Sequence, residues 1–235
     1  MEFPANIYPW MNLKKKGVEL KLIQNKGGKI SIDDIEKSID QNTRVFTISW
    51  VQFLNGFRAD LEEIGKLCHE RGILFVVDAI QGFGVFEMDV KKYNIDAFAS
   101  GCYKWLMVPD GVGYLYVKKD LLEEIDVTDI GWWNVKDERD FLNYDLTFKE
   151  DARKFHISHP NPLGVHGLNA SLDLISKVGI KEIENRVLHL TDILIDGLRN
   201  LNVEIKSPLE RKYLSLIHIS EPTRPLYISY AVFCL

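Results

Sequence analysis

The chain has 235 residues, of which 46% are hydrophobic and 27% charged, and its formal net charge is −5 at pH 7. This mild acidity argues against a nucleic acid or an anionic membrane surface as the main partner. No apolar run approaches the roughly 20 residues of a membrane-spanning helix, and the start of the chain lacks a signal-peptide pattern. Cys68 and Cys102 have no metal-ligand spacing, which predicts a reducing compartment. We therefore expect a cytoplasmic protein.

Helices and strands alternate along the first half of the chain. Ser31 suits the N-cap of a first helix, and Gly72 ends a second one. Residues 73–77 form a continuous apolar run, which is typical of a parallel strand buried on both faces. The alternation predicts an α/β layered sheet. The expected elements are helices over 31–39 and 61–71 and strands over 44–50, 73–77, 95–100 and 112–117.

The composition changes after Lys119. Residues 120–150 are charged and show no clear periodicity, so we expect a connecting segment. Two long helices are predicted over 162–177 and 180–200, and a strand begins near Val203. The second of these helices has an apolar group close to one face, made of Ile183, Val187, Leu190, Ile193, Leu194 and Leu198.

The C-terminal stretch, residues 214–235, resembles the in-frame translation of a transposon-end sequencing adapter. Its first eleven residues match one fixed part of the adapter, the next three would fill the variable index, and the last eight match the fixed part that follows. A match on both sides of a gap is hard to obtain by chance, so we exclude this stretch from fold reasoning. The alternative is a C-terminal β segment over 226–235, which is apolar enough.

Asp78 directly follows the apolar run, and so lies at the carboxyl end of a strand. Open α/β sheets hold their ligands at that edge. Gln81, three residues later, could hydrogen-bond a ligand from the same turn. The alternative is that Asp78 caps a turn and Gln81 is solvated.

Lys104 lies among aromatic and aliphatic residues, 26 positions after Asp78. Desolvation disfavours the ammonium form of such a lysine. A neutral amine can attack an aldehyde, which is how pyridoxal 5'-phosphate (PLP) is held as a Schiff base, and an aspartate pairs with the pyridinium nitrogen of that cofactor. The alternative is that the aliphatic stem of Lys104 packs on its neighbours. Asp78, Gln81 and Lys104 together favour a PLP enzyme.

Two other motifs carry weaker indications. Gly111-Val-Gly113 leads into a strand rather than a helix, so it fails as a dinucleotide fingerprint. His156, Ser158, His159 and His166 gather near the long helices, but no acid completes a metal set and no Gly-x-Ser-x-Gly elbow supports a hydrolase. We expect a turn with incidental histidines and no metal site.

The stretch from Arg44 to Val117 resembles class V aminotransferase-fold PLP enzymes, a group that includes cysteine desulfurases, kynureninases and serine–glyoxylate-type aminotransferases. The similarity covers nearly all of residues 1–213. It rests on Asp78-x-x-Gln81, the Lys104 segment with its trailing Pro-x-Gly-x-Gly, Asn55-Gly-Phe-Arg58, and the opening Glu2-Phe-Pro-Ala-Asn6-Ile-Tyr-Pro-Trp10.

The resemblance implies the α/β fold of the PLP-dependent transferases of fold type I. Residues 1–119 would be a partial PLP-binding large domain and 120–161 a connecting segment. Residues 162–213 would start the small C-terminal α/β domain, and the adapter-like stretch 214–235 would follow.

The resemblance also implies roles for single residues. Asp78 would pair with the pyridine nitrogen, Gln81 would contact the phenolic oxygen of PLP, and Lys104 would form the Schiff base and move the α-proton. Ser100 is the expected phosphate-binding hydroxyl. Phe53 stands where desulfurases carry a cofactor-touching asparagine, and Gln52 is the expected substitute.

Two further departures concern the residues before the lysine. Tyr103 stands where many relatives have histidine, and Gly101 stands where a serine often lies. Phe53 argues mildly against a desulfurase, and so does the looser similarity of the motif to class V proteins in general.

The family's glycine-rich phosphate loop and ring-stacking residue precede the segment that Glu2 opens, and its substrate-binding arginine follows Pro208. We therefore expect a fragment of a longer gene that binds PLP weakly by itself. The expected function of the parent is a PLP-dependent transferase or lyase that acts on a small amino acid as a homodimer. The alternatives are a cysteine desulfurase-type lyase, or a catalytically inactive fragment that binds a partner.

Overall fold

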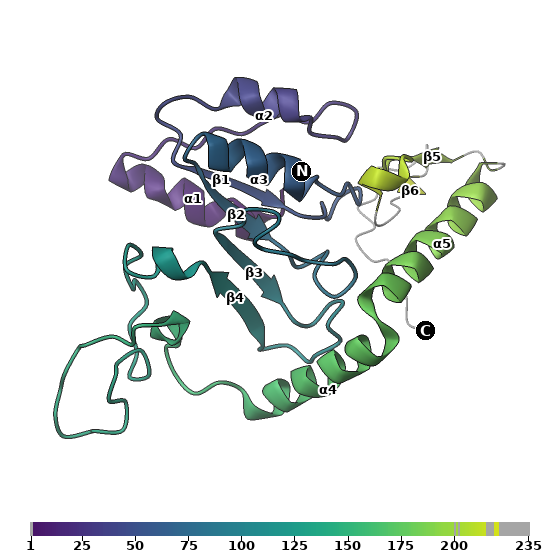
Figure 1. Ribbon diagram of the computed structural model, residues 1–235. Coiled ribbons are helices and arrows are strands. Elements are labelled where there is room, and N and C mark those ends of the chain that lie inside the picture. The colour runs from purple at the N-terminus through teal and green to yellow at the C-terminus, as the bar shows by residue number, and fades with distance from the viewer. Residues whose placement is uncertain (1, 200, 202, 215–218, 221–235) are drawn as a thin grey trace.

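The structure is a computed structural model that describes residues 2–199, 201, 203–214 and 219–220. At its centre lies a four-stranded sheet in the order β1 (Val45–Ser49), β2 (Leu74–Asp78), β3 (Ala97–Gly101) and β4 (Gly113–Val117). The first three strands are parallel, and β4 is antiparallel to β3 (Figure 1). The carboxyl ends of the three parallel strands therefore meet at one edge, as the α/β prediction requires.

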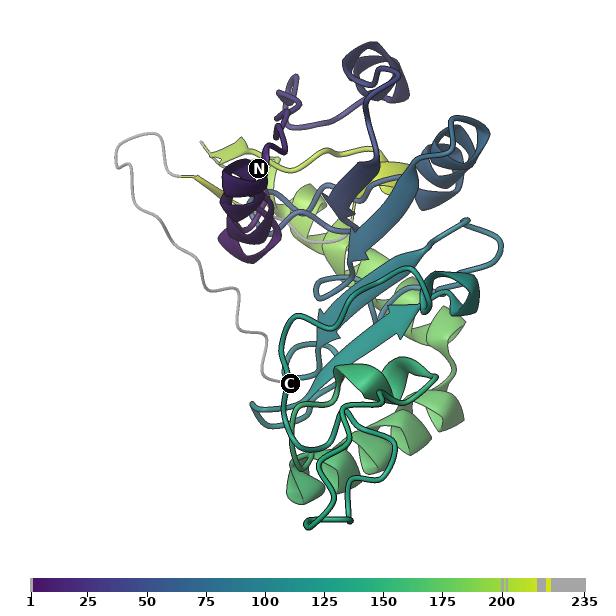
Figure 2. The same ribbon diagram turned by 90° about the vertical axis from the view of Figure 1, so that its left-hand side faces the viewer.

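Helices flank this sheet. In Figure 2, α1 (Tyr8–Asn12) and α3 (Leu61–Glu70) lie on opposite sides of β1 and β2. The remaining helices are α2 (Ile32–Ser38), α4 (Pro162–Val178) and α5 (Ile180–Leu198). Short 3-10 helices cover Pro4–Asn6, Leu13–Lys16, Lys119–Leu121, Ala152–Phe155 and Arg211–Tyr213. None of the described helices is both long and apolar enough to cross a membrane.

The helix ends follow local chemistry. Ser31 caps α2 by accepting the N–H of Asp34 at 3.2 Å, as predicted. Asp60 does the same for α3 with the N–H of Glu63, also at 3.2 Å. Gly72 has a φ of +65°, a left-handed conformation that ends the α3 region at little cost. The predicted apolar face of α3 is buried, with Leu61, Ile64, Leu67 and Cys68 in the core.

Strand β2 is buried mainly on one face, so the prediction of two buried faces was wrong. Phe75 and Val77 are fully buried against the core, whereas Leu74 is 37% exposed and Val76 only half-buried. Side chains alternate across a strand, so Leu74, Val76 and Asp78 share the second face. Val76 and Asp78 line a cavity, which explains why an apolar run leaves this face partly open.

Helix α5 fully buries only Leu198 of the apolar group found in the sequence, together with residues beside that group. Its buried side chains are Leu188, Thr191, Ile195 and Leu198, whereas Leu190 is 37% and Ile193 55% exposed. The helix has more apolar residues than one face holds, and the side that contacts the neighbouring elements is the one that becomes buried. Sequence periodicity alone cannot choose between two adjacent apolar faces.

The last described segments pack onto the body of the protein. Leu214 is 1% exposed and forms an isolated antiparallel bridge with Phe57. Strand β5 (Glu204–Ile205) pairs antiparallel with β6 (Ile219–Ser220). The rest of the adapter-like stretch lies outside the described residues, and its origin stays a prediction. The predicted domain boundaries likewise stay predictions.

Candidate active site

Asp78 and Ser100 lie at the carboxyl-end edge of the sheet. Asp78 is the last residue of β2, and the strand register places it beside Ala99 of β3. The Ile80 N–H donates to Asp78 Oδ1 at 3.1 Å. Ser100 is 5% exposed, and its hydroxyl donates to the Gly101 carbonyl at 3.1 Å. Both residues line one cavity, as the sequence predicts for a site at strand ends.

This cavity has a volume of about 620 Å³, within the range of small-molecule sites. Its other polar lining comes from Asn6, Tyr114, Arg153 and His156. The sequence does not single out Asn6 or Arg153, and it suggests for His156 only the roles of metal ligand or hydrolase base. Arg153 is held by a double contact with the carboxylate of Asp151, so its charge is already paired.

Lys104 lies in the turn between β3 and β4. The Met107 N–H donates to the Lys104 carbonyl at 2.9 Å, and Met107 has a φ of +54°. A left-handed conformation at a non-glycine residue is uncommon and marks a tight, constrained turn. Lys104 itself is half-buried. The turn therefore fixes the backbone from which the lysine side chain starts.

Lys104 and Asp78 influence each other electrostatically. Burial lowers the pKa of the Lys104 amine, and the charge of Asp78 partly opposes this. Burial raises the pKa of the Asp78 carboxyl, the charge of Glu2 raises it further, and the Ile80 N–H and Lys104 lower it. The lysine thus has the direction of shift that favours a neutral, nucleophilic amine.

The two predicted glutamines have different surroundings. Gln52 is fully buried, and its Nε2 donates to Glu2 Oε1. Its Oε1 is the single fully buried side-chain N or O atom without a hydrogen-bond partner in the part of the chain that the structure describes. Gln81 is half-buried in the turn after β2. Neither glutamine lines the 620 Å³ cavity.

Glu2 is a functional candidate that sequence reasoning missed. In the sequence it is only part of the opening motif, yet its carboxylate accepts hydrogen bonds from Asn6, Ser49 and Gln52. The residues that meet there lie far apart in the sequence, so no local pattern could have shown the cluster.

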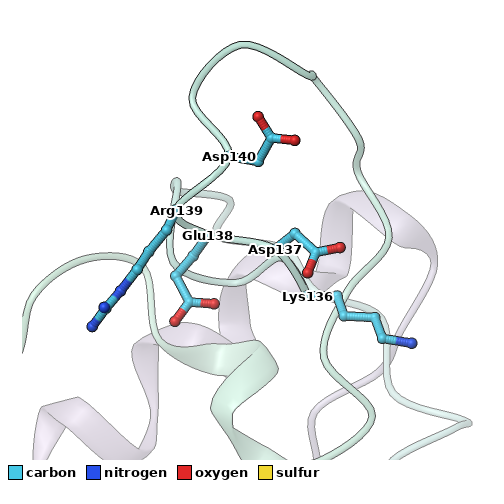
Figure 3. Close-up of a pocket in the computed structure, with 5 residues that line it drawn as sticks. All are labelled: Lys136, Asp137, Glu138, Arg139 and Asp140. Atoms are coloured by element: carbon cyan, nitrogen blue, oxygen red, sulfur yellow. The ribbon is translucent and has the colours of Figure 1, made fainter.

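A second, smaller hollow of about 340 Å³ lies in the connecting segment, and its lining consists of residues 136–140 (Figure 3). Its side chains come from one loop and diverge, with Arg139 pointing away from Lys136. Glu138 accepts from the Trp133 indole at 3.3 Å and pairs with Lys149 at 3.2 Å. These contacts order the loop, and we assign no chemistry to it.

The histidines of the connecting segment have different surroundings, and His156 is the one that lines the 620 Å³ cavity. His159 packs edge-on against Trp132 and Trp133, with ring centroids 4.9 and 4.2 Å away. Over the described residues, no three His, Cys, Asp or Glu side chains are placed to share a metal ion.

Comparison with known proteins decides the family. The model of the family described as "Aminotransferase class-V" matches residues 1–220. The chain belongs to the class V aminotransferase family. A probable cysteine desulfurase from Pyrococcus abyssi is 34% identical to it over 209 residues, which cover 88% of this chain and 51% of the relative. A probable cysteine desulfurase from Methanothermobacter thermautotrophicus is 31% identical over 84% of this chain and 50% of the relative.

Solved structures of class V proteins have the same fold. The apo cysteine desulfurase from Thermococcus onnurineus superposes with a TM-score of 0.85 at 27% identity, and the match covers 94% of this chain and 55% of that structure. The cysteine desulfurase CsdA from Escherichia coli gives a TM-score of 0.82 at 24% identity, over 93% of this chain and 54% of that structure. The predicted fold type I architecture is confirmed. The chain spans about half the length of the curated relatives it matches.

The described residues fit the ring and aldehyde ends of a pyridoxal group. A ring N–H needs an acceptor, and Asp78 Oδ2 has no partner among the described residues, because only Ile80 bonds this carboxylate. An aldehyde needs an amine of lowered pKa, which Lys104 supplies.

Proposed function

We propose that this class V protein is a PLP-dependent transferase or lyase that acts on a small amino acid, with Lys104 as the residue that binds the cofactor. The carrying observation is that Asp78 and Ser100 line one cavity at the carboxyl-end edge of the sheet, and that burial lowers the pKa of the Lys104 amine, which the charge of Asp78 reaches. The cavity beside Asp78 and Ser100 has room for a small molecule. Membership of the family supports the same cofactor.

When bound, PLP supplies an electron sink for charge that develops at the substrate α-carbon. Asp78 would accept the ring N–H and so keep the ring protonated. The Lys104 amine would take the α-proton and return it. Gln81 is proposed to contact the phenolic oxygen, Ser100 to donate to the phosphate, and Gln52 to lie in the position of the family's asparagine.

Borohydride trapping tests this proposal. The wild-type chain, incubated with excess PLP and reduced, should carry the cofactor on the Lys104 peptide, as read by mass spectrometry. Lys104→Ala should lose that label, whereas Lys118→Ala should keep it, because Lys118 lies beyond β4 and pairs with Asp96 at 3.5 Å. Labelling spread evenly over surface lysines would contradict the proposal and favour the inactive, partner-binding alternative.

A cysteine desulfurase activity is the second candidate. Its support is that several relatives, including those from P. abyssi and M. thermautotrophicus, are named probable cysteine desulfurases. Against it, Phe53 stands at the predicted asparagine position and packs edge-on with Phe3, with ring centroids 5.2 Å apart. Release of sulfide and alanine from cysteine, compared with amino transfer to a keto acid, separates the two reactions.

We also propose that the whole protein is a cytoplasmic homodimer without nucleic-acid or membrane partners. The net charge of −5 supports the exclusion of polyanions. The connecting segment exposes large apolar side chains that a second subunit could cover, among them Phe141, Leu142 and Tyr144 at 66%, 94% and 96%. Cys68 and Cys102 are free and buried, which suits a reducing compartment. Light scattering of the whole protein tests the dimer.

A further inference from the structure

Helix α4 packs on the lysine turn, residues 102–108, which carries Lys104. The face of the helix that meets this turn consists of residues three or four positions apart, namely Gly164, Leu168, Ser171 and Ile175. Leu168 and Ile175 pack against the buried residues of the turn, which are Cys102, Leu106 and Val108. The helix that the sequence assigns to the start of the small domain therefore supports the turn from which the lysine side chain starts.

Ser171 is the polar member of that face. It is buried, and its hydroxyl donates to the Leu106 carbonyl. Leu106 is buried as well, so water has little access to this carbonyl. Among the described residues, no backbone N–H donates to it. Because a buried carbonyl without a donor is costly, the Ser171 hydroxyl fills a need that the turn itself leaves open.

The peptide group that Ser171 binds is also bound by Lys104. The Leu106 carbonyl and the Met107 N–H belong to one planar unit, and this N–H donates to the Lys104 carbonyl at 2.9 Å. The φ of Met107 is +54° and sets the tilt of the same plane. One peptide plane is thus held on its oxygen side by Ser171 and on its N–H side by Lys104.

This plane needs such support because its conformation is strained. A left-handed conformation at a non-glycine residue costs free energy, and it persists only where the surrounding structure holds it. The other backbone bond that closes the turn runs from the Val108 N–H to the Cys102 carbonyl at 3.0 Å. Ser171 is the contact that reaches the plane from outside the turn, so it links the placement of Lys104 to α4.

We propose that Ser171 is a positioning residue of the active site, whose hydroxyl holds the peptide plane between Leu106 and Met107 and so keeps Lys104 in place for the cofactor aldehyde. The proposal rests on the proposed function, since it concerns the same lysine. Ser171 acts through the backbone of the turn and does not itself touch the ligand.

Ser171→Ala tests this role, because it deletes the hydroxyl and keeps the rest of the helix face. Without its donor, the strained plane should relax more often. In the cofactor-free chain, the Met107 and Val108 amides should exchange with solvent hydrogen about tenfold faster, which corresponds to about 1.4 kcal/mol. The dissociation constant for PLP, followed by absorbance, should rise about threefold or more, since only chains that present Lys104 correctly bind the cofactor.

Thr191→Val is the matched control. Thr191 is buried to nearly the same degree as Ser171, at 8% against 7% exposure. Its hydroxyl also donates to a backbone carbonyl, that of Val187 in its own helix α5, at 2.9 Å. The variant therefore removes a buried hydroxyl of the same kind outside the lysine turn. Exchange at Met107 and Val108 and the dissociation constant for PLP should both stay at the wild-type values.

The outcomes separate the two proposals. If the wild-type chain binds no PLP even at excess, the proposed function fails, and the proposal for Ser171 fails with it. If wild type binds PLP, the proposal for Ser171 alone fails in any of three cases: unchanged exchange at Met107 and Val108 in S171A, an unchanged dissociation constant in S171A, or an equal loss of affinity in T191V. Either of the last two results would assign the hydroxyl a structural role only.

Discussion

Asp78 and Lys104 are coupled across the end of the sheet, and burial acts on them in opposite directions. Burial raises the pKa of the Asp78 carboxyl and lowers the pKa of the Lys104 amine. The Lys104 charge opposes the shift of Asp78, and the Asp78 charge opposes the shift of Lys104. Burial thus favours the uncharged form of both groups in the cofactor-free protein. A ligand that carries a ring N–H for Asp78 and an aldehyde for Lys104 would satisfy both groups at once.

Asp78→Asn should stabilise the cofactor-free chain at pH 7. The pKa of the Asp78 carboxyl is raised in the folded protein. The protonated carboxyl therefore contributes fully to stability at pH values below about 3.8, which is the pKa in the unfolded chain, and this contribution is lost as the pH rises through the folded-state pKa. At pH 7 the ionised carboxylate therefore costs stability. We expect a rise of roughly 2–4 °C in melting temperature, the response to about 1 kcal/mol in a chain of this size.

The matched control for that experiment is Asp145→Asn. Hydrogen bonds from Thr147 lower the pKa of the exposed Asp145 carboxyl. The ionised carboxylate therefore contributes to stability at pH values above its unfolded-state pKa, and this contribution is lost as the pH falls. D145N should leave the melting temperature at pH 7 unchanged or slightly lower. An equal rise in both variants would show that net charge, rather than burial of Asp78, governs the response.

Cys68 and Cys102 should resist alkylation in the native protein. Burial raises the pKa of the Cys68 thiol to about 12, and it raises that of Cys102 as well. Since the thiolate is the reactive form, iodoacetamide at pH 8 should label neither residue until denaturant is added, as read by peptide mapping. The neutral Cys68 thiol contributes to stability at pH values below about 9, its unfolded-state pKa, and this contribution is lost as the pH rises toward 12. Native labelling of Cys68 at pH 8 would contradict its burial.

Gly65→Ala should destabilise the packing of α3. A Cβ at this position would lie 1.8 Å from the Tyr93 carbonyl oxygen, a backbone atom that cannot move away alone. Overpacking of this kind typically costs about 1–3 kcal/mol, measured as a shift of the urea midpoint. Gly197→Ala in α5 is the control, because nothing lies within 4 Å of its added Cβ. It should be neutral or stabilising by up to about 1 kcal/mol.

Arg58 should couple energetically to Glu184 of α5. The guanidinium donates to Glu184 Oε1 at 2.9 Å and lies 4.2 Å from the centroid of the Phe86 ring. Both charged side chains are largely covered, at 18% and 27% exposure. A double-mutant cycle of R58M and E184Q should give a coupling of about 1 kcal/mol. The control is the exposed Lys66–Glu70 pair, whose Nζ and Oε1 atoms are 4.0 Å apart, and its coupling should be no more than about 0.5 kcal/mol. Equal couplings in the two pairs would show that burial does not strengthen the Arg58–Glu184 pair.

Local chemistry in the sequence was enough for the helices and strands of the sheet and for the placement of Asp78 at a strand end. The Ser31 cap, the apolar face of α3 and Gly72 act within one or two turns of chain, so their effects can be read from neighbouring residues. Asp78 was placed at a strand end by the run that precedes it, and its register beside Ser49 and Ala99 confirms that placement. Its role and those of Gln81, Ser100 and Lys104 stay predictions.

Tertiary structure decided which apolar faces are covered and which polar groups meet. The second face of β2 is partly open because a cavity adjoins it. Helix α5 fully buries only Leu198 of the apolar group found in the sequence, and its other buried residues lie beside that group. Glu2 meets Ser49 and Gln52 across 47 and 50 positions of sequence. Periodicity and motifs report only local spacing, whereas a hydrogen-bond cluster of this kind exists only once the chain has folded and brought distant donors to one carboxylate.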